Sequence, residues 1–224
     1  KDTSQRQAQN VMLESQIGGT TDGIAIQGQY AYIGVGARLV ILNISDLAHP
    51  NFVGQTDLLP SLVYDVAVAG NYAYIINHIN GLRIIDVSDP TTPFETGLFI
   101  TGGAPQSVIL AGGYAYVVDL FTGLWILDVS NPAAPTEVGH CITAGNAHGA
   151  AIVDNYAYIA DGDLGLRIID VSNPTTPIEE GFYDTPGNAN KVAVAGEYAY
   201  VADGDEGLRI IIITNPVPPL EVIS

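Results

Sequence analysis

Tyr156–Pro174 reads YAYIADGDLGLRIIDVSNP, and close copies of this stretch recur along the chain. Its opening tripeptide, Tyr-Ala-Tyr, occurs five times, and each occurrence begins 42 residues after the one before. The five starting positions are Tyr30, Tyr72, Tyr114, Tyr156 and Tyr198. A fixed period of this length is the signature of a repeat architecture in which each unit is one supersecondary element.

The flanks of the tripeptide repeat as well. In the last four copies, Gly-Leu follows nine residues after the first tyrosine, and an apolar run such as RIIDVS then ends at Asx-Pro. The first copy is looser, because its run LVILNIS starts one residue early at Leu39 and Leu47 replaces the proline. The agreement of spacing and flanks indicates five copies of one unit.

Each unit contains four short apolar segments, rich in Val, Ile and Tyr and bounded by turn residues, which is typical of strands. Around the fourth and fifth copies the segments are Leu166–Val171, Ile178–Tyr183, Lys191–Ala195 and Tyr198–Ala202. Four antiparallel strands in about 40 residues form the blade of a propeller. The sequence therefore predicts an all-β, five-bladed β-propeller. A parallel β-helix is the alternative, but its repeat would be shorter and would lack three separate turns.

Domain organisation follows from the same repeat. Residues 1–10 are polar and are predicted to be a flexible segment, and residues 11–224 to form a single propeller domain. Val11–Ile17 resembles the fourth-strand segments such as Glu137–Ile142. We predict that it forms the outer strand of the last blade and closes the ring. Leu220–Ile223 competes for the same place.

Composition limits the partners. The 24 acidic residues outnumber the seven basic ones, and the net charge is −17. Phosphate neutralisation needs clustered Lys and Arg, so neither nucleic acid nor an anionic membrane surface is an expected partner. Cations or neutral ligands fit this charge better, although the acidity could serve solubility alone. Cys141 is the only cysteine, so no intrachain disulfide can form. No apolar run is long enough for membrane insertion.

The repeated unit V-A-G-x-Y-A-Y-V-A-D-G-x-x-G-L-R-I-I-D-V-S-N-P-x-x-P resembles the LVIVD repeat, from about Val11 to Pro219. The third copy departs with Trp125 in place of Arg, and the fifth with Ile212 in place of Asp. That family occurs in bacterial and archaeal cell-surface proteins and is thought to form propellers. The resemblance implies a secreted or cell-surface location, with the signal peptide outside this sequence, and a protein that is monomeric or part of a larger multidomain surface protein. It implies no catalytic residues.

Positions at which the copies differ are the candidates for function. Eight residues before each Tyr-Ala-Tyr stands a polar residue, and no two of the five are alike. We expect these residues at the mouth of the innermost strands, near the axis, where propeller loops converge on ligands. With two of their neighbours they form the predicted ligand-binding set: Asp22, Tyr64, Asp65, Gln106, His148, Asn190 and Lys191. The alternative is that these positions are merely exposed to solvent at the mouth of the channel, where any polar residue is tolerated.

The loops between the second and third strands carry a second candidate site. Carboxylates in Asp-Gly-Asp segments supply the oxygen ligands that calcium prefers. The candidate metal ligands are Asp161, Asp163, Asp203 and Asp205. Asp-Gly is also a favoured hairpin turn, which explains the same letters without a metal. No cofactor other than calcium is indicated.

These observations favour a binding or scaffolding module that presents a polar axial face to a glycan, a protein or a cation. The chain contains no Gly-x-Ser-x-Gly elbow and no P-loop, and its four histidines lack metal-ligand spacing. Two alternatives remain open: a glycosidase-like enzyme that uses carboxylates at the axial mouth, and an inert structural spacer.

Overall fold

The computed structural model describes residues 21–213 and 220–221, and in these it is built from five four-stranded antiparallel sheets. Each sheet consists of four strands that are consecutive in the chain, so every sheet is a simple meander. The first three sheets contain β1 (Thr21–Gln27), β2 (Tyr30–Val35), β3 (Arg38–Asn43), β4 (Asn51–Gln55); β5 (Asp65–Ala69), β6 (Tyr72–Ile76), β7 (Leu82–Asp86), β8 (Phe94–Phe99); and β9 (Pro105–Ala111), β10 (Tyr114–Asp119), β11 (Gly123–Asp128), β12 (Thr136–Cys141). The last two contain β13 (Gly149–Val153), β14 (Tyr156–Ala160), β15 (Leu166–Asp170), β16 (Ile178–Tyr183); and β17 (Lys191–Ala195), β18 (Tyr198–Ala202), β19 (Leu208–Ile212), β20 (Leu220–Glu221).

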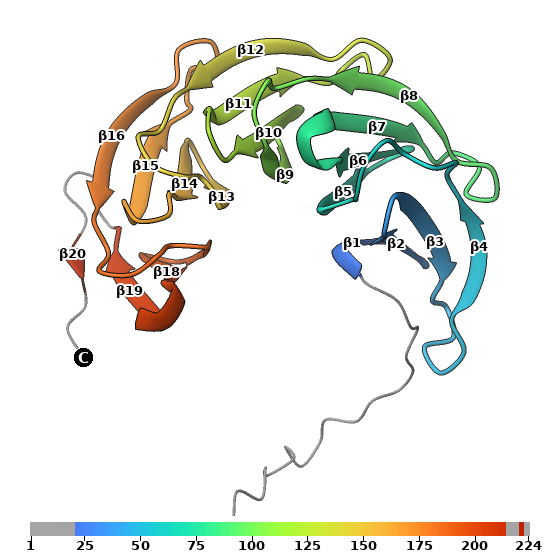
Figure 1. Cartoon of the computed structure of the whole chain (residues 1–224), viewed down its shortest axis with the longest axis horizontal. Helices are drawn as coiled ribbons and strands as arrows, with labels where there is room; N and C mark the ends of the chain where they lie inside the picture. The colour runs from blue at the N-terminus through green and yellow to red at the C-terminus, as the bar shows by residue number, and fades with distance from the viewer. Residues whose placement is uncertain (1–20, 214–219, 222–224) are drawn as a thin grey trace, which may run out of the picture.

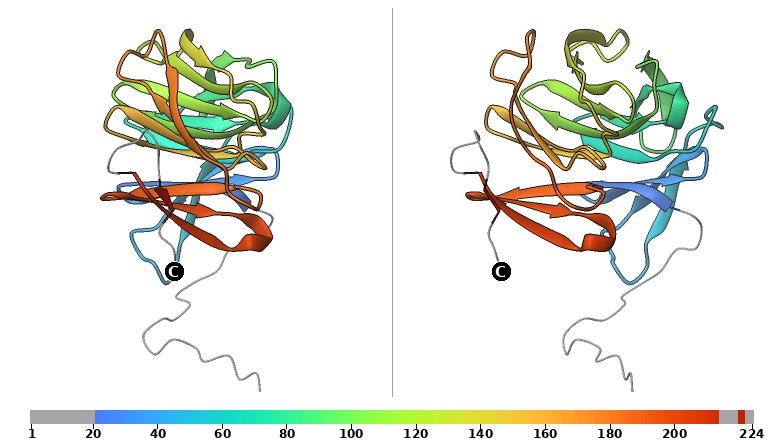
Figure 2. Two further views of the ribbon diagram at one scale, coloured as in Figure 1. Left: turned by 90° about the vertical axis from the view of Figure 1, so that its left-hand side faces the viewer. Right: turned by 60° about the vertical axis from the view of Figure 1, so that its left-hand side comes forward.

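The sheets are arranged as the blades of a propeller (Figure 1). The first strand of each blade lies innermost, and β1, β5, β9, β13 and β17 contact one another in that order. The fourth strands β4, β8, β12 and β16 form the rim (Figure 1). The side views in Figure 2 show twisted blades stacked one behind the next. The prediction of an all-β protein with five four-stranded antiparallel blades is confirmed.

The core lies between the blades rather than within a single layer. One cluster of buried side chains fills each of the four interfaces between consecutive blades. The second tyrosine of the tripeptide lies in these interfaces and is only 3–5% exposed in the first four copies: Tyr32, Tyr74, Tyr116 and Tyr158. Burial, followed by the neighbouring tyrosine, raises the pKa of each of these phenols, so they stay protonated. Because both faces of an inner blade are packed, its strands are apolar without clean alternation.

Glycines on the rim strands allow the blades to approach closely. A Cβ on Gly139 of β12 would overlap the carbonyl oxygen of Pro174, which lies in the Asn-Pro turn of the following blade. Gly97 and Pro132 repeat this contact one interface earlier. Next to each glycine, a β-bulge shifts the register of pairing between the third and fourth strands. The Asx-Pro motif therefore ends the third strand of its own blade and also packs against the fourth strand of the previous blade.

The arc of blades is open between the last sheet and the first (Figure 1). Within the described residues, no contact like those between consecutive blades joins β17–β20 to β1–β4. β20 begins the fourth strand of the last blade, since Ile211 pairs with Glu221 and Ile212 with Leu220. Leu220 and Glu221, from the C-terminal segment that competes with Val11–Ile17, therefore occupy the start of the fourth-strand position in the last blade. Val11–Ile17 lies outside the described residues, as do residues 1–10, and closure by that segment stays a prediction.

Candidate binding site at the axial mouth

The site begins with the connectors that link the rim strand of one blade to the innermost strand of the next. Three of them share the pattern Thr-x-Gly, starting at Thr101, Thr143 and Thr185. Each threonine is nearly buried and donates its hydroxyl to an aspartate at the end of the second strand of the following blade. Those aspartates are Asp119, Asp161 and Asp203, and each is fully buried.

The connector between the third and fourth blades illustrates the geometry. Thr143 Oγ1 donates to Asp161 Oδ1 at 2.7 Å, and the backbone N–H of Gly145 donates to Oδ2 at 2.9 Å. A Cβ on Gly145 would overlap the backbone and carboxylate of Asp161, so the glycine is required by close approach. Burial raises the pKa of Asp161, and the bonds from Thr143 and Gly145 act in the opposite direction. The connector is thus anchored at Thr143 and Gly145, and Gly145 lies four residues before the start of the innermost strand.

Three residues after Gly145 stands His148, one of the predicted site residues, and Asn190 has the same place after Gly187. His148 N–H donates to the carbonyl of Ala160 at 2.9 Å, and Asn190 N–H to that of Ala202 at 2.8 Å. These bonds extend each innermost strand by one residue and fix the side chains at the mouth. The pattern Thr-x-Gly, which sequence reasoning did not single out, is therefore the signal that positions Gln106, His148 and Asn190.

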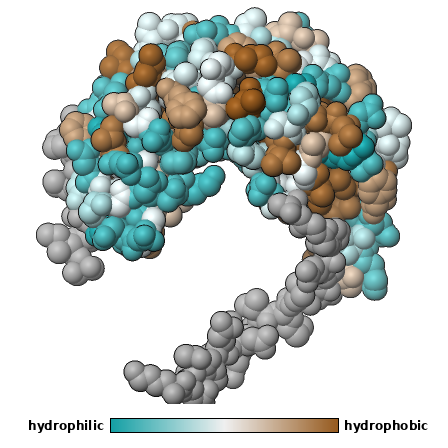
Figure 3. Space-filling model, in the orientation of Figure 1, coloured by the Kyte–Doolittle hydropathy of each residue, from teal (hydrophilic) through white to brown (hydrophobic). Residues whose placement is uncertain are grey.

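The predicted residues lie around one cavity of about 490 Å³. All five blades contribute to it, although the first and last sheets do not pack together. Hydrophilic residues are prominent along the inner margin of the last blades on the face seen in Figure 3. The lining consists of Asp22, Leu62, Tyr64, Gln106, His148, Asn190 and Lys191. Six of the seven predicted residues are in this set, and Leu62 is an addition.

Asp65 is the predicted residue that the structure places elsewhere. Its Oδ2 accepts bonds from the Ser107 hydroxyl at 2.8 Å and the Val108 N–H at 2.9 Å. Both donors belong to the next blade, so Asp65 joins two innermost strands and does not line the cavity. Its equivalent in the fifth blade, Lys191, does line the cavity, so the bonds from Ser107 and Val108 distinguish Asp65 from it.

The cavity carries few charges. Asp22 and Lys191 are its one carboxylate and one ammonium group among the lining residues. Burial, followed by the charge of Lys191, lowers the pKa of His148, while Asp161 and Asp163 act against this shift. His148 is therefore neutral at pH 7 and has one nitrogen that donates and one that accepts. In contrast to the chain as a whole, the lining has no net charge at neutral pH.

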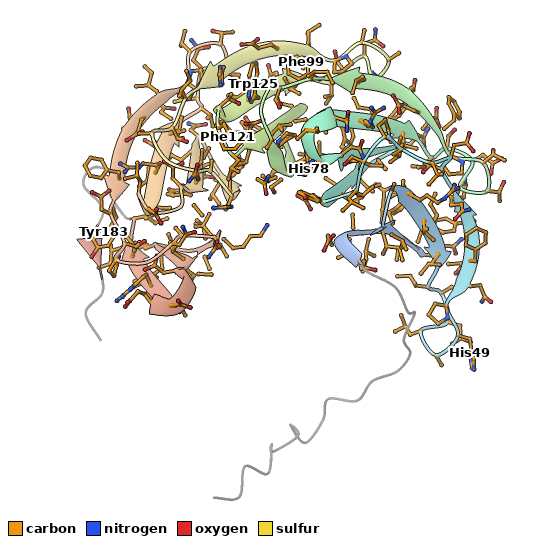
Figure 4. The ribbon with its side chains drawn as sticks, in the orientation of Figure 1. His49, His78, Phe99, Phe121, Trp125 and Tyr183 are labelled. Carbon is orange, nitrogen blue, oxygen red and sulfur yellow. The ribbon has the colours of Figure 1, made fainter. Side chains whose placement is uncertain are left out.

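An aromatic pair lies at one side of the mouth. The ring of Tyr64 meets that of His78 edge to face, with centroids 4.8 Å apart. His78 belongs to the short 3-10 helix η1 (His78–Asn80) and has a positive φ of 44°. Figure 4 shows His78 on the viewed face. The phenol hydroxyl of Tyr64 and the amides of Gln106 and Asn190 give the mouth both donors and acceptors.

The candidate calcium ligands are not gathered into one cluster. The described residues contain no group of three or more His, Cys, Asp or Glu that could hold a metal ion. Asp161 and Asp203 instead accept bonds from a connector threonine and glycine. Asp163 accepts a bond from Asn188 at 2.8 Å. Asp205 lies in the 3-10 helix η2 (Gly204–Glu206). Protein donors therefore satisfy the buried carboxylates at these positions.

The recurring arginine of the third strands forms ion pairs and ring contacts within the structure. Arg167 Nη2 lies 3.0 Å from Asp184, its Nε lies 3.7 Å from Asp161, and its guanidinium covers the ring of Phe182 at 4.6 Å. In the third blade Trp125 replaces this arginine and stacks on His140, with ring centroids 3.9 Å apart. Figure 4 shows Trp125 toward the outer side of the arc, away from the mouth.

Five segments of the chain match the LVIVD repeat: residues 18–57, 62–101, 102–143, 144–185 and 186–224. The chain belongs to the LVIVD repeat family. Four of these segments begin in the connectors described above, so each family unit contains one connector followed by one blade. No curated protein sequence matches the chain.

Many solved structures share the fold. One is the crystal structure of the computationally designed Ika8 protein, which superimposes with a TM-score of 0.71 at 10% sequence identity. The superposition covers 86% of the LVIVD chain and 58% of the designed chain, so the protein spans little more than half the length of that relative. At this identity the likeness concerns the fold alone. Within the described residues of the LVIVD protein, no helix is long and apolar enough to cross a membrane.

Proposed function

We propose that this LVIVD protein is a binding module whose axial mouth takes a neutral, polar ligand, and that the ligand is a glycan. The observation that carries the proposal is a contrast within the repeat. Packing residues recur from copy to copy, whereas the residue eight positions before each Tyr-Ala-Tyr differs in all five, and these residues line one cavity of about 490 Å³. Positions that were only scaffold would be expected to repeat with the scaffold.

The chemistry of the lining supports a glycan rather than an ion. Tyr64, Gln106, Asn190 and neutral His148 together offer donors and acceptors, which sugar hydroxyls require. Tyr64 adds an aromatic ring of the kind that packs on the apolar face of a sugar. A cavity of this volume lies in the ordinary range for small-molecule sites. One ammonium and one carboxylate at its border suit a ligand without net charge.

The two other functions that the sequence left open receive less support from this geometry. A glycosidase needs two carboxyl groups across the scissile bond. Among the described lining residues Asp22 is the one carboxylate, and Asp65 is engaged by Ser107 and Val108. An inert spacer would be expected to have its mouth filled by apolar side chains, whereas Leu62 is the only aliphatic residue in this lining.

We also propose that the module works at the cell surface or in the extracellular medium. This part of the proposal rests on the resemblance to repeats of bacterial and archaeal surface proteins and on the acidic composition. Fractionation of the source cells, followed by detection of the protein with an antibody, tests it directly. A protein found only in the cytosol would contradict this part and leave the binding site untouched.

A glycan array tests the function. The wild-type protein is expected to bind a restricted set of neutral glycans, and Asn190→Ala is expected to weaken every hit. Asn155→Ala is the control, because Asn155 is an exposed residue in the turn between β13 and β14, at the opposite end of its blade. Each hit is also incubated with the protein to assay hydrolysis. No binding on the array, or equal effects of both variants, would contradict the proposal, and hydrolysis would favour the enzyme.

A further inference from the structure

The short helix η1 holds a histidine in a backbone conformation for which other copies use glycine. His78 stands six residues after the first tyrosine of its copy, and its φ of 44° lies in the left-handed region. At the same place three other copies have a glycine with φ between 58° and 62°: Gly36, Gly162 and Gly204. Glycine adopts this conformation without strain because it has no Cβ, whereas a histidine there is strained. Strain of this kind gathers at functional sites, so it points to a use for the side chain of His78.

The side chain of His78 lies at the edge of the axial cavity (Figure 4). Its ring meets that of Tyr64, a lining residue, edge to face at 4.8 Å. η1 also contacts β9, the strand that contains Gln106. The amide of Asn77, directly before η1, donates to the carbonyl of Leu62 at 3.2 Å and so joins η1 to the connector. The strained residue is therefore held between two elements that line the cavity.

Two exposed aliphatic side chains accompany this histidine. Leu62 lines the cavity and is 49% exposed, and Ile79 of η1 is 61% exposed. At the place of Ile79 the fourth and fifth copies have Asp163 and Asp205, so they carry a charge where the second copy carries an apolar group. Leu62 and Ile79 belong to the second blade and its connector, which have a described blade on either side. Neighbouring apolar side chains that stay exposed in such a place mark an interaction site.

We propose that Leu62, His78 and Ile79 form an aglycone subsite, which binds an aromatic group attached to the sugar in the cavity. The inference rests on the proposed glycan function and names the ligand as an aryl glycoside. Hydroxyl groups of the sugar are bound by Gln106 and Asn190, whose amides both donate and accept. The subsite itself contains no carboxylate or ammonium group and suits a group without hydroxyls.

An aromatic ring fits this subsite better than an alkyl chain. Tyr64 and His78 already form an edge-to-face pair, and a third ring can join it in the same geometry. A rigid ring also loses less conformational freedom on binding than a flexible chain does. The subsite is continuous with the cavity through Leu62, so a ring linked directly to the sugar reaches it.

Paired glycosides separate this inference from the function on which it rests. The probes are the methyl and phenyl glycosides of glucose, galactose, mannose and N-acetylglucosamine, each titrated into the full chain by calorimetry. For a sugar that binds, the phenyl glycoside is expected to bind about tenfold more tightly than the methyl glycoside, because the subsite removes the ring from water. Equal affinities would overturn the inference and leave the sugar site intact. Failure of every glycoside to bind would contradict the proposed function as well, and an octyl glycoside that binds more tightly than the phenyl one would overturn the choice of a ring.

Replacement of His78 by the residue of the other copies tests the subsite directly. His78→Gly relieves the strained backbone, so the melting temperature is expected to stay level or rise. The phenyl and methyl glycosides are nevertheless expected to bind this variant with nearly equal affinity. Ile79→Ser, a change at an exposed position, is expected to reduce the preference for the phenyl glycoside in the same way.

Asp154→Gly is the matched control. Asp154 also has a positive φ, of 52°, but it lies in the turn between β13 and β14, at the opposite end of its blade from the mouth. This variant is expected to keep the full preference for the phenyl glycoside. A His78→Gly protein that keeps the preference, or an equal loss in the Asp154→Gly control, would overturn the proposal.

Discussion

At the scale of single residues, the 42-residue period separates scaffold from site. Five lining residues could be predicted from sequence because their offset from Tyr-Ala-Tyr is constant, and Lys191 because it is the neighbour of one of them. Asp65 could not be assigned correctly, since the period gives a position along a strand and not the bond that its carboxylate makes. Leu62 could not be found because the connector between the first two blades lacks the Thr-x-Gly pattern of the other three.

Removing a connector hydroxyl tests the anchoring of the site. Thr143→Val keeps the shape of the side chain but leaves the buried Asp161 carboxylate with one donor fewer. We expect a loss of about 1–3 kcal/mol in the free energy of unfolding, measured by urea denaturation. Thr136→Val on the same blade is the control, because Thr136 is exposed and should change stability little. Equal losses would show that the bond to Asp161 is not what fixes the connector.

The electrostatics of the mouth can be tested at His148. Its pKa lies below the ordinary value because of burial and, second, the charge of Lys191. A lowered pKa means that the neutral form persists as the pH falls, and the ring becomes protonated only below its usual range. Lys191→Met is expected to raise the pKa of His148, measured by NMR titration of the imidazole protons. Glycan affinity should accordingly be constant around neutral pH and fall in acid. An unchanged titration would contradict the placement of Lys191 beside His148.

At the scale of elements, the strands followed from the sequence almost residue by residue. Lys191–Ala195 and Tyr198–Ala202 are predicted and observed with the same limits, and Leu166–Val171 differs by one residue. Short strands between Gly and Pro turns leave little freedom in their limits. The rim contacts could not be predicted, because they depend on how close one blade comes to the Asx-Pro turn of the next.

The rim glycines provide a test of this packing. Gly139→Ala would set a Cβ against the carbonyl of Pro174, and the backbone on both sides leaves no flexible atom to move. We expect a loss of about 1–3 kcal/mol in the free energy of unfolding, the range for overpacking a filled space. Glu137→Ala, at an exposed position of the same strand, should change stability by much less. A Gly139→Ala protein as stable as the wild type would mean that the blades are farther apart than described.

The loops between second and third strands give a prediction about metal. Protein donors satisfy Asp161 and Asp203, and no cluster of ligands forms among the described residues. Treatment with EGTA followed by dialysis is therefore expected to leave the melting temperature unchanged, and added calcium should not raise it. A rise in melting temperature with calcium would restore the metal site that the Asp-Gly-Asp segments suggested, because a ligand that binds the folded state stabilises it.

At the scale of the whole molecule, the number of blades was predictable and their closure was not. The count follows from the repeat, whereas the opening between the last and first sheets depends on the angle between neighbouring blades, which no single repeat encodes. The same opening exposes Leu208, although its sequence context matches that of the buried Leu166. The burial of this leucine therefore depends on whether a neighbouring blade covers it.

The central claim is that the five unlike residues at the axial mouth bind one ligand together. Isothermal titration calorimetry with the best neutral glycan from the array tests it most directly. Removing a single hydrogen-bonding side chain, in Gln106→Ala or Asn190→Ala, is expected to weaken binding about three- to tenfold. The double variant should lose more than either single one, because the residues belong to different blades and share one ligand. Binding that survives in the double variant with the affinity of the Asn155→Ala control would contradict the account.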